Sequence, residues 1–189
     1  MRRCDPELLR AIVEGARRAE PPGGMSTRIV AIDGQGGAGK STLAEQVARE
    51  LDAPVLHTDD FASWEEPLDW WPRLIDEALR PLARGERARF RRSSWGPGHD
   101  PGWAELEPAP FVVLEGVTAS REAFRPWLAY TVWVETPFEL RLARGVERDG
   151  EAMRGQWEEW ARQEDAYVAA ERPHERADLV VRGDRDLWR

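Results

Sequence analysis

Short apolar runs alternate along the chain with longer segments in which apolar residues recur every three or four positions. Apolar runs of strand length lie at 28–33, 54–58, 111–114, 130–134 and 177–181. Segments with helical periodicity lie at 5–20, 40–51, 68–83, 137–149 and 156–171. The strand-length runs are mostly apolar rather than alternating, which is typical of parallel strands buried on both faces. The pattern therefore predicts an α/β fold in which helices cover both faces of a mostly parallel sheet.

Two parts of the chain stand apart from this alternation. Residues 1–24 contain an amphipathic helix and the Pro/Gly linker that ends it, and we expect this helix to pack as an appendage. Residues 85–110 begin with a basic stretch that favours a hairpin or an extended flap, and continue into a loop rich in glycine and proline. We therefore expect one domain at 25–189, with the segment at about 85–110 as its flap or substrate element.

Composition narrows the classes of protein that fit this chain. The 189 residues carry a net charge of −8, which disfavours a nucleic-acid partner because phosphate backbones attract positive surfaces. The apolar runs are all shorter than the roughly 18–20 residues of a membrane-spanning helix, and the single cysteine, Cys4, excludes an internal disulfide. We expect a cytoplasmic protein that does not enter membranes. Of the 27 basic residues only Lys40 is a lysine, which suggests that arginine will not serve at that position.

The stretch GQGGAGKS from Gly34 to Ser41 matches the phosphate-binding pattern G-x-x-x-x-G-K-[ST] in full. It follows a predicted strand and opens a predicted helix, which is the context that the motif requires. Glycines let the backbone turn its N–H groups toward phosphate oxygens, and the helix dipole adds positive potential. We expect Lys40 to reach the outer phosphates and the Ser41 hydroxyl to bind a Mg²⁺ ion held on them. The residues expected to bind a nucleoside triphosphate are Gly34, Gly36, Gly37, Ala38, Gly39, Lys40, Ser41 and Thr42.

Acidic residues follow two of the predicted strands. Asp59 and Asp60 end the second predicted strand, and Glu115 ends the third. Ligands of parallel sheets bind at the carboxyl ends of the strands, so these carboxylates are expected near a γ-phosphate. Asp59 and Glu115 are candidates to hold Mg²⁺, in part through water, or to accept a proton; the alternatives are helix caps and solvated loop acids. For His57 a structural role is favoured over a catalytic one.

Three arginines, Arg141, Arg144 and Arg148, are three and four residues apart and share one face of a predicted helix. In a chain so rich in arginine, such a face is often only a solvated surface. The functional alternative is a lid at about 141–156, whose guanidinium groups neutralise charge on a phosphoryl group during transfer.

In combination these motifs resemble the uridine kinase-like branch of the P-loop kinases, over about residues 28–183. Besides the phosphate loop, the resemblance rests on DDF at 59–61, EG at 115–116, RLARGVERD at 141–149 and ADLVV at 177–181. It implies a P-loop NTPase three-layer α/β/α sandwich with a five-stranded, mostly parallel sheet and a small flap and lid region. It also implies ATP and Mg²⁺ as cofactors. By this resemblance Asp59 is the general base that activates an acceptor hydroxyl, while Lys40, Arg144 and Arg148 act on the transferring phosphate.

The flap departs from the family's pattern. There the family carries a tyrosine-aspartate pair that helps to hold a nucleoside, whereas the corresponding stretch here is RRSSW at 91–95. The candidates for contacts with the acceptor are Asp60, Arg91, Trp95 and His99, with Trp103 as a further ring near the pocket.

The expected function is transfer of the γ-phosphate of ATP to a small-molecule hydroxyl, with uridine or cytidine as the first acceptor to test. A second interpretation is a kinase for a nucleoside monophosphate, a sugar or an antibiotic; a monophosphate would need cations such as Arg91, Arg92 and Arg125. An interpretation from another class is an ATP-dependent regulatory switch without an acceptor. Asp59 disfavours the switch, because hydrolysis needs no base for an acceptor hydroxyl. The sequence leaves homo-oligomer formation open.

Overall fold

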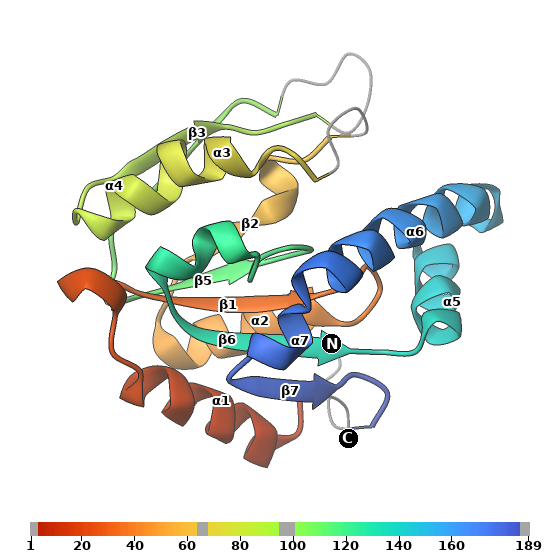
Figure 1. Cartoon of the computed structure of the whole chain (residues 1–189), viewed down its shortest axis with the longest axis horizontal. Coiled ribbons are helices and arrows are strands. Elements are labelled where there is room, and N and C mark those ends of the chain that lie inside the picture. The colour runs from red at the N-terminus through yellow and green to blue at the C-terminus, as the bar shows by residue number, and fades with distance from the viewer. Residues whose placement is uncertain (1–3, 64–67, 95–100, 186–189) are drawn as a thin grey trace.

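Parallel strands form the centre of the molecule (Figure 1). The computed structural model describes residues 4–63, 68–94 and 101–185. The strands of the main sheet are β1 (Arg28–Gly34), β2 (Val55–His57), β5 (Phe111–Glu115), β6 (Leu128–Glu135) and β7 (Leu179–Arg182). They lie in the order β2-β5-β1-β6-β7, and every pairing is parallel. The predicted five-stranded parallel sheet is therefore confirmed.

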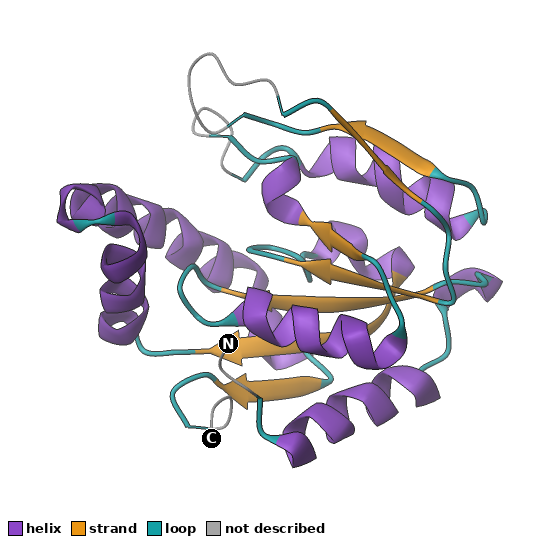
Figure 2. Cartoon of the chain, turned by 180° about the vertical axis from the view of Figure 1, so that it is seen from behind, coloured by secondary structure: helices purple, strands orange, loops and turns teal. Residues whose placement is uncertain are grey.

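Helices flank this sheet on both sides, as the view from behind in Figure 2 shows. On one face lie α1 (Pro6–Arg18) and α2 (Lys40–Leu51). On the other face lies a helical segment made of α3 (Trp71–Leu74), a π-helical turn (Ile75–Leu79) and α4 (Arg80–Ala83). Beside that segment, β3 (Ala88–Arg91) and β4 (Trp103–Leu106) pair as an antiparallel hairpin. The three-layer α/β/α sandwich is confirmed.

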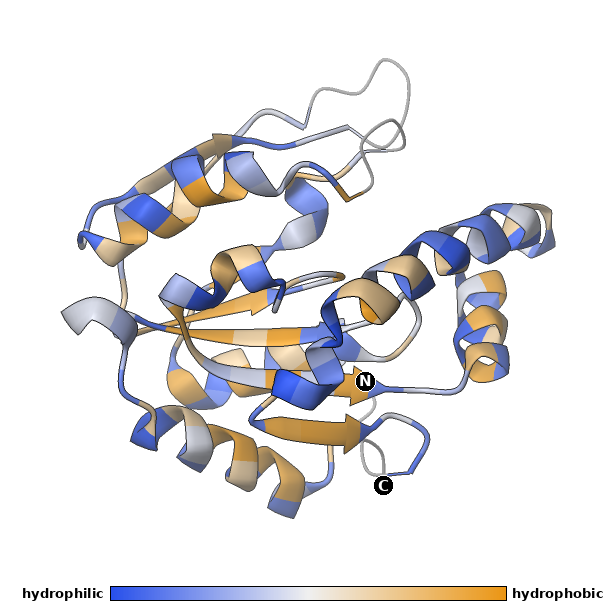
Figure 3. Ribbon diagram, viewed as in Figure 1, coloured by the Kyte–Doolittle hydropathy of each residue, from blue (hydrophilic) through white to orange (hydrophobic). Residues whose placement is uncertain are grey.

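The central strand β1 supplies apolar side chains to both faces of the sheet. Val30 and Ile32 are fully buried in the core shared with α1 and α2. Ile29 and Ala31 are fully buried in the core shared with α3 and α4. A strand covered on both faces needs apolar residues at successive positions, which is why the run is not alternating. Figure 3 shows the same contrast as mostly orange strands between helices of mixed colour.

The N-terminal helix α1 is built into one of these cores. The Asp5 side chain accepts hydrogen bonds from the backbone N–H groups of Glu7 and Leu8, at 2.9 and 3.3 Å, and so caps the helix. Its apolar stripe buries Ile12, Val13 and Ala16. The expected packing appendage therefore lies against the sheet rather than apart from it.

The segment after β6 carries the last helices of the chain. These are α5 (Phe138–Asp149), α6 (Arg154–Glu171) and the short α7 (Pro173–Arg176). Figure 1 shows α5 and the start of α6 beyond the arrowheads of the strands, at the carboxyl edge of the sheet. The candidate lid therefore stands at the edge where ligands of parallel sheets bind.

Several local predictions are corrected. The helix predicted at 68–83 is interrupted by the π-helical turn, which lies directly before Pro81. Proline has no N–H for the regular helical bond and its ring clashes with the preceding turn, so the backbone opens locally. Strand β4, helix α7 and the 3-10 segment Glu122–Trp127 were not predicted. Among the described residues, no helix is long and apolar enough to cross a membrane.

Candidate active site

The phosphate loop joins the end of β1 to the start of α2. Gly37 and Gly39 have φ values of +75° and +106°, in the left-handed region that favours glycine. A Cβ at Gly37 would also lie 2.5 Å from the backbone oxygen of Arg141. Lys40 is the first residue of α2, so the positive end of that helix faces the loop. The local structure thus has the form that the motif predicts for binding phosphate.

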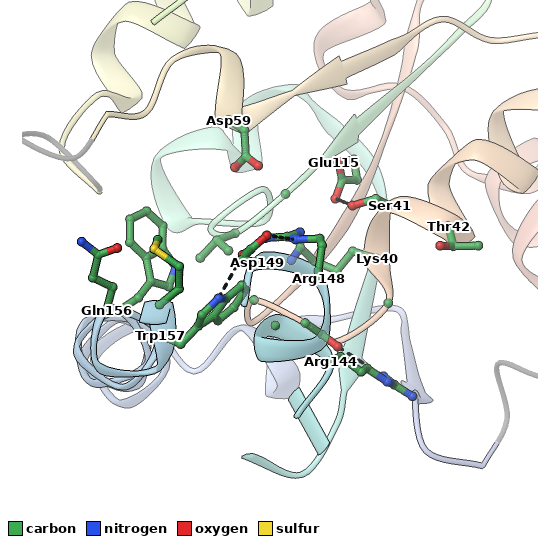
Figure 4. A pocket seen from close by; sticks show the side chains of 18 residues that line it. Lys40, Ser41, Thr42, Asp59, Glu115, Arg144, Arg148, Asp149, Gln156 and Trp157 are labelled. Carbon is green, nitrogen blue, oxygen red and sulfur yellow. Dashed lines mark hydrogen bonds and ion pairs between the residues drawn. The ribbon is translucent and has the colours of Figure 1, made fainter. Parts of the chain in front are cut away.

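Lys40 and Ser41 both line a cavity of about 730 Å³ at the carboxyl edge of the sheet. Lys40 is only 7% exposed, and its Nζ donates a hydrogen bond to the backbone oxygen of Gln35 at 3.2 Å. The Ser41 hydroxyl donates to Oε1 of Glu115 at 2.9 Å, as Figure 4 shows. The pairing of β5 with β1 brings Glu115 to the loop, because the carboxyl ends of the two strands are neighbours.

Glu115 has a second partner, His57, for which a structural role was favoured over a catalytic one from the sequence. His57 lies opposite Glu115 in the register of β2 with β5, and His57 Nδ1 is 2.8 Å from Glu115 Oε2. Burial raises the pKa of Glu115, but the hydrogen bond from His57 and the charge of Lys40 outweigh burial and leave that pKa below its usual range. The same hydrogen bond raises the pKa of His57. Glu115 is therefore held as a carboxylate beside Ser41.

Asp59 reaches the same cavity from the end of β2. It lies in a 3-10 turn over Thr58–Asp60, and it lines the cavity together with Lys40 and Ser41. Burial raises the pKa of the Asp59 carboxyl, and the charge of Lys40 opposes that rise. The turn fits closely against the loop after β5: Gly116 has φ +139°, and a Cβ there would collide with Oγ1 of Thr58.

Asp60, the neighbour of Asp59, has a different environment. Its Oδ1 lies 3.2 Å from Nε of Arg92, and its backbone oxygen accepts a hydrogen bond from the Ser93 N–H at 2.6 Å. It is not among the described residues that line the cavity. The two adjacent carboxylates are therefore separated, with Asp59 turned to the cavity and Asp60 bonded to the flap.

The three arginines of α5 do not share one environment. Arg141 is 4% exposed; its Nη1 lies 3.3 Å from Oε2 of Glu164, and its Nε donates to the backbone oxygen of Thr136. Arg144 lines the cavity but donates to the backbone oxygens of Gly37, Ala38 and Gly183. Arg148 also lines the cavity. By their spacing the three arginines share one face of α5, but they lie at different levels along the helix. Arg141, near the start of α5, is buried against Glu164 of α6, whereas Arg144 and Arg148, further along, line the cavity.

Of these three arginines, Arg148 has the most exposed side chain. Its guanidinium is paired with Asp149 at 2.8 Å and lies 5.3 Å from the ring centroid of Trp157. The Asp149 hydrogen bond raises the pKa of Arg148. Figure 4 shows Arg148 and Asp149 together between Lys40 and Trp157.

Those residues predicted for the acceptor that the structure describes lie outside the cavity lining. Arg91 is an exposed residue of β3 and is not among the described residues that line the cavity. Trp103 is 60% exposed, and the guanidinium of Arg89 lies 4.6 Å from its ring centroid. Arg125 pairs with Glu122 on the surface at 3.2 Å. Trp95 and His99 lie outside the described residues.

One wall of the cavity is made of residues that were not predicted as site residues. It comes from the start of α6 and the residue before it, and consists of Met153, Gln156, Trp157 and Trp160. Figure 4 shows Gln156 and Trp157 on the side of the cavity away from Ser41 and Thr42. Ten tryptophans are spread along the chain, so no local signal marked these two.

Two buried carboxylates anchor α6 to the sheet. Oε1 of Glu164 accepts a hydrogen bond from the Gly36 N–H of the phosphate loop at 2.8 Å. Oδ2 of Asp33, at the end of β1, accepts bonds from the Tyr167 hydroxyl at 2.8 Å and the Ser120 hydroxyl at 2.7 Å. Burial raises the pKa of both carboxyls. The wall on α6 is thus held in place relative to the phosphate loop.

Solved structures share this fold, although no family model and no curated protein matches the chain. A possible uridine kinase from Bacillus stearothermophilus has a TM-score of 0.69 and 19% identity, over 93% of this chain and 97% of that chain. A sugar kinase from Janibacter sp. HTCC2649 has a TM-score of 0.51 and 20% identity, over 84% of this chain and 87% of that chain. The chain has the fold of the P-loop kinases. The resemblance stated from the motifs is confirmed at the level of the fold.

The donor set of this P-loop kinase fold suits a nucleotide with Mg²⁺. Backbone N–H groups at a helix start and a buried lysine match phosphate, and the Ser41 hydroxyl with the Glu115 carboxylate supplies the oxygen ligands that Mg²⁺ prefers. Among the described residues, no group of three or more His, Cys, Asp or Glu side chains could hold a metal. That finding is compatible with Mg²⁺, which is usually bound by one or two carboxylates and by phosphates of the substrate.

Proposed function

We propose that the protein is an ATP- and Mg²⁺-dependent phosphotransferase that moves the γ-phosphate of ATP to a hydroxyl of a small molecule. The observation that carries the proposal is the position of Asp59. Its carboxyl lines the same cavity as Lys40 and Ser41, and its pKa is raised by burial. A general base works best when its pKa approaches the working pH, so a raised aspartate pKa suits proton transfer from an alcohol.

In this proposal the cavity has a phosphate end, formed by the loop from Gly34 to Thr42, and an acceptor end, which includes Asp59. The loop from Gly34 to Thr42 binds the phosphates of ATP, with Lys40 beside the outer ones. Ser41 and Glu115, with Asp59 nearby, are the residues proposed to hold Mg²⁺, in part through water. When bound, the ion neutralises charge on the β- and γ-phosphate oxygens.

In the proposed reaction the acceptor oxygen attacks the γ-phosphorus. The bond between that phosphorus and the oxygen bridging to the β-phosphate breaks, and ADP leaves with the bond's electron pair. The proton of the acceptor hydroxyl moves to the Asp59 carboxylate. Arg148, and Arg144 if it leaves its backbone partners, would balance the negative charge on the phosphoryl group during transfer.

The test is turnover of Mg·ATP against a panel of acceptors, with products followed by mass. Because the similar structures are named as a possible uridine kinase and a sugar kinase, the panel contains uridine, cytidine and simple sugars, together with nucleoside monophosphates and hydroxylated antibiotics. One acceptor that gains 80 mass units (the mass of one phosphoryl group), well above the rate of ATP hydrolysis, would support the proposal. ADP formation that is independent of every acceptor would favour a regulatory ATPase instead.

A further inference from the structure

The wall that α6 presents to the cavity is apolar and aromatic. Met153, Trp157 and Trp160 are spaced by four and three residues, so they lie on one side of the helix. All three are neither fully buried nor fully exposed, and all three line the cavity. A side chain that is packed on one side and open to a cavity on the other is available to contact a ligand.

The polar edges of both indole rings are already used. The Trp160 Nε1–H donates to Oε1 of Glu164, and the Trp157 Nε1–H donates to Oδ2 of Asp149 at 3.0 Å. The hydrogen-bonding group of each ring is thus directed at the protein, which leaves ring carbon for the cavity. The polar group of this wall is the side-chain amide of Gln156, which can both donate and accept a hydrogen bond.

The charges around the cavity disfavour an anionic acceptor. Among the described residues, the cations that line it are Lys40, Arg144 and Arg148. Lys40 lies at the phosphate loop, Arg144 donates to three backbone oxygens, and Arg148 is paired with Asp149. Asp59 adds a carboxylate. Of the cations that could serve a phosphorylated acceptor, Arg92 and Arg125 are paired with Asp60 and Glu122, and Arg91 is exposed on β3 outside the cavity lining.

We infer that the acceptor is an uncharged hydroxyl compound with a flat or apolar face, which packs on Trp160 and Met153 and is bound at its polar edge by Gln156. The inference rests on the proposed function and adds the class of substrate to it. A nucleobase and the C–H face of a sugar ring both have this chemistry, since both stack on indole carbon. Gln156 and Asp59 line the same cavity, and Figure 4 shows both on the side away from Thr42, so a compound packed on the wall shares the cavity with the proposed base.

The first arm of the test compares matched pairs of acceptors. Uridine is compared with uridine monophosphate, and fructose with fructose 6-phosphate, as kcat/KM for phosphorylated product. We expect the uncharged member of the accepted pair to exceed its phosphate by more than a hundredfold, and the pair that reacts identifies the ring as a base or a sugar. Preference for the phosphorylated member would overturn the inference while leaving the kinase proposal intact.

The second arm uses Trp160→Ala and Gln156→Ala, with Trp103→Ala as the matched control because Trp103 is exposed outside the cavity. Loss of one stacked ring typically costs about ten- to hundredfold in affinity, so we expect Trp160→Ala to raise KM for the acceptor by that factor and to leave KM for ATP within twofold. Gln156→Ala, at an exposed helical site, tests the same wall without risk to the fold, and should raise the acceptor KM by about fivefold, of the order of one lost hydrogen bond. Trp103→Ala should change neither KM.

A rise in KM for ATP with no change for the acceptor would overturn the inference, because the wall would then bind the nucleotide. If Mg·ATP is hydrolysed and no compound in these pairs or in the full acceptor panel gains a phosphate, the proposed function fails and the inference fails with it. That result is distinguished from the others by the absence of any phosphorylated product.

Discussion

The two ends of the cavity are built in different ways. The phosphate end is one continuous stretch, from Gly34 to Thr42, in which the glycines and the start of α2 carry their own local geometry. The opposite end is assembled from residues far apart in the chain, among them Asp59 and Gln156 (Figure 4). The first can be recognised from a motif, whereas the second depends on how β2, β5 and α6 pack. The contrast explains why nucleotide binding is easier to infer than the acceptor.

A large loss of turnover is expected at the phosphate end, from substitution of Lys40. Removal of one charge that stabilises a transferring phosphoryl group should lower turnover by about 10²–10³-fold or more in Lys40→Ala. Lys40→Arg should also lose most of its activity, because a planar guanidinium cannot replace a compact ammonium in this buried position. Acceptor-dependent ADP release is the measurement.

Arg49→Ala, at an exposed position of the same helix, is the control for Lys40 and should retain the activity of the unaltered protein. Full activity in Lys40→Arg would contradict the account, since arginine occupies every other basic position in the chain.

The second effect concerns the buried ion pair of Arg141 and Glu164, which holds α6 against the phosphate loop. Glu164→Ala leaves the Arg141 charge buried without its carboxylate and removes the acceptor of the Gly36 N–H, so the free energy of unfolding should fall by about 3–5 kcal/mol. Urea denaturation measures the loss. Glu159→Ala removes an exposed ion pair with Arg162 on the same helix and should cost less than about 1 kcal/mol.

The double variant Arg141→Met/Glu164→Leu should recover much of the stability lost in Glu164→Ala, because no unpaired charge remains buried. Equal losses in Glu164→Ala and Glu159→Ala would mean that the buried pair does not hold α6 against the phosphate loop.

The smallest effect is a pH dependence that belongs to the acceptor end. Burial raises the pKa of Asp59, so the carboxylate needed as a base is lost at a higher pH than for an exposed aspartate. As the pH falls below that raised pKa, kcat should drop by about tenfold per pH unit, since only the ionised form accepts the proton. A pH–rate profile of Asp60→Asn should keep this acidic limb. If kcat stays constant down to the pH at which an exposed aspartate titrates, the result contradicts the role of Asp59 as base.

The elements that could be predicted from the sequence are those with local signals. Apolar runs predicted the five strands, and the motif predicted the loop between β1 and α2. Strand β4 was missed because four residues with a flanking loop carry little periodic signal. The π-helical turn ends two residues before Pro81, and the interruption of the regular helix by this proline was not predicted from the sequence.

The parts of the site that were missed depend on packing. The contact of His57 with Glu115 depends on the pairing and register of β2 with β5, which the prediction of the two strands does not fix. The different environments of Arg141 and Arg148 could not be foreseen, because helical spacing does not say at which level along α5 the buried contacts with α6 end and the cavity begins. The tryptophans of α6 were indistinguishable from the others in the chain until the fold placed them at the cavity.

The measurement that tests the central claim most directly is a comparison of Asp59→Asn with the unaltered protein in two assays, ATP binding and acceptor-dependent turnover. The account predicts a loss of roughly 10²–10⁴-fold in turnover with nearly unchanged affinity for ATP, because the loop from Gly34 to Thr42 binds the phosphates while Asp59 accepts the acceptor's proton. Asp60→Asn serves as the adjacent control and should keep most of the turnover. Loss of ATP binding together with turnover in Asp59→Asn, or loss of turnover in Asp60→Asn alone, would contradict the division of the cavity into two ends.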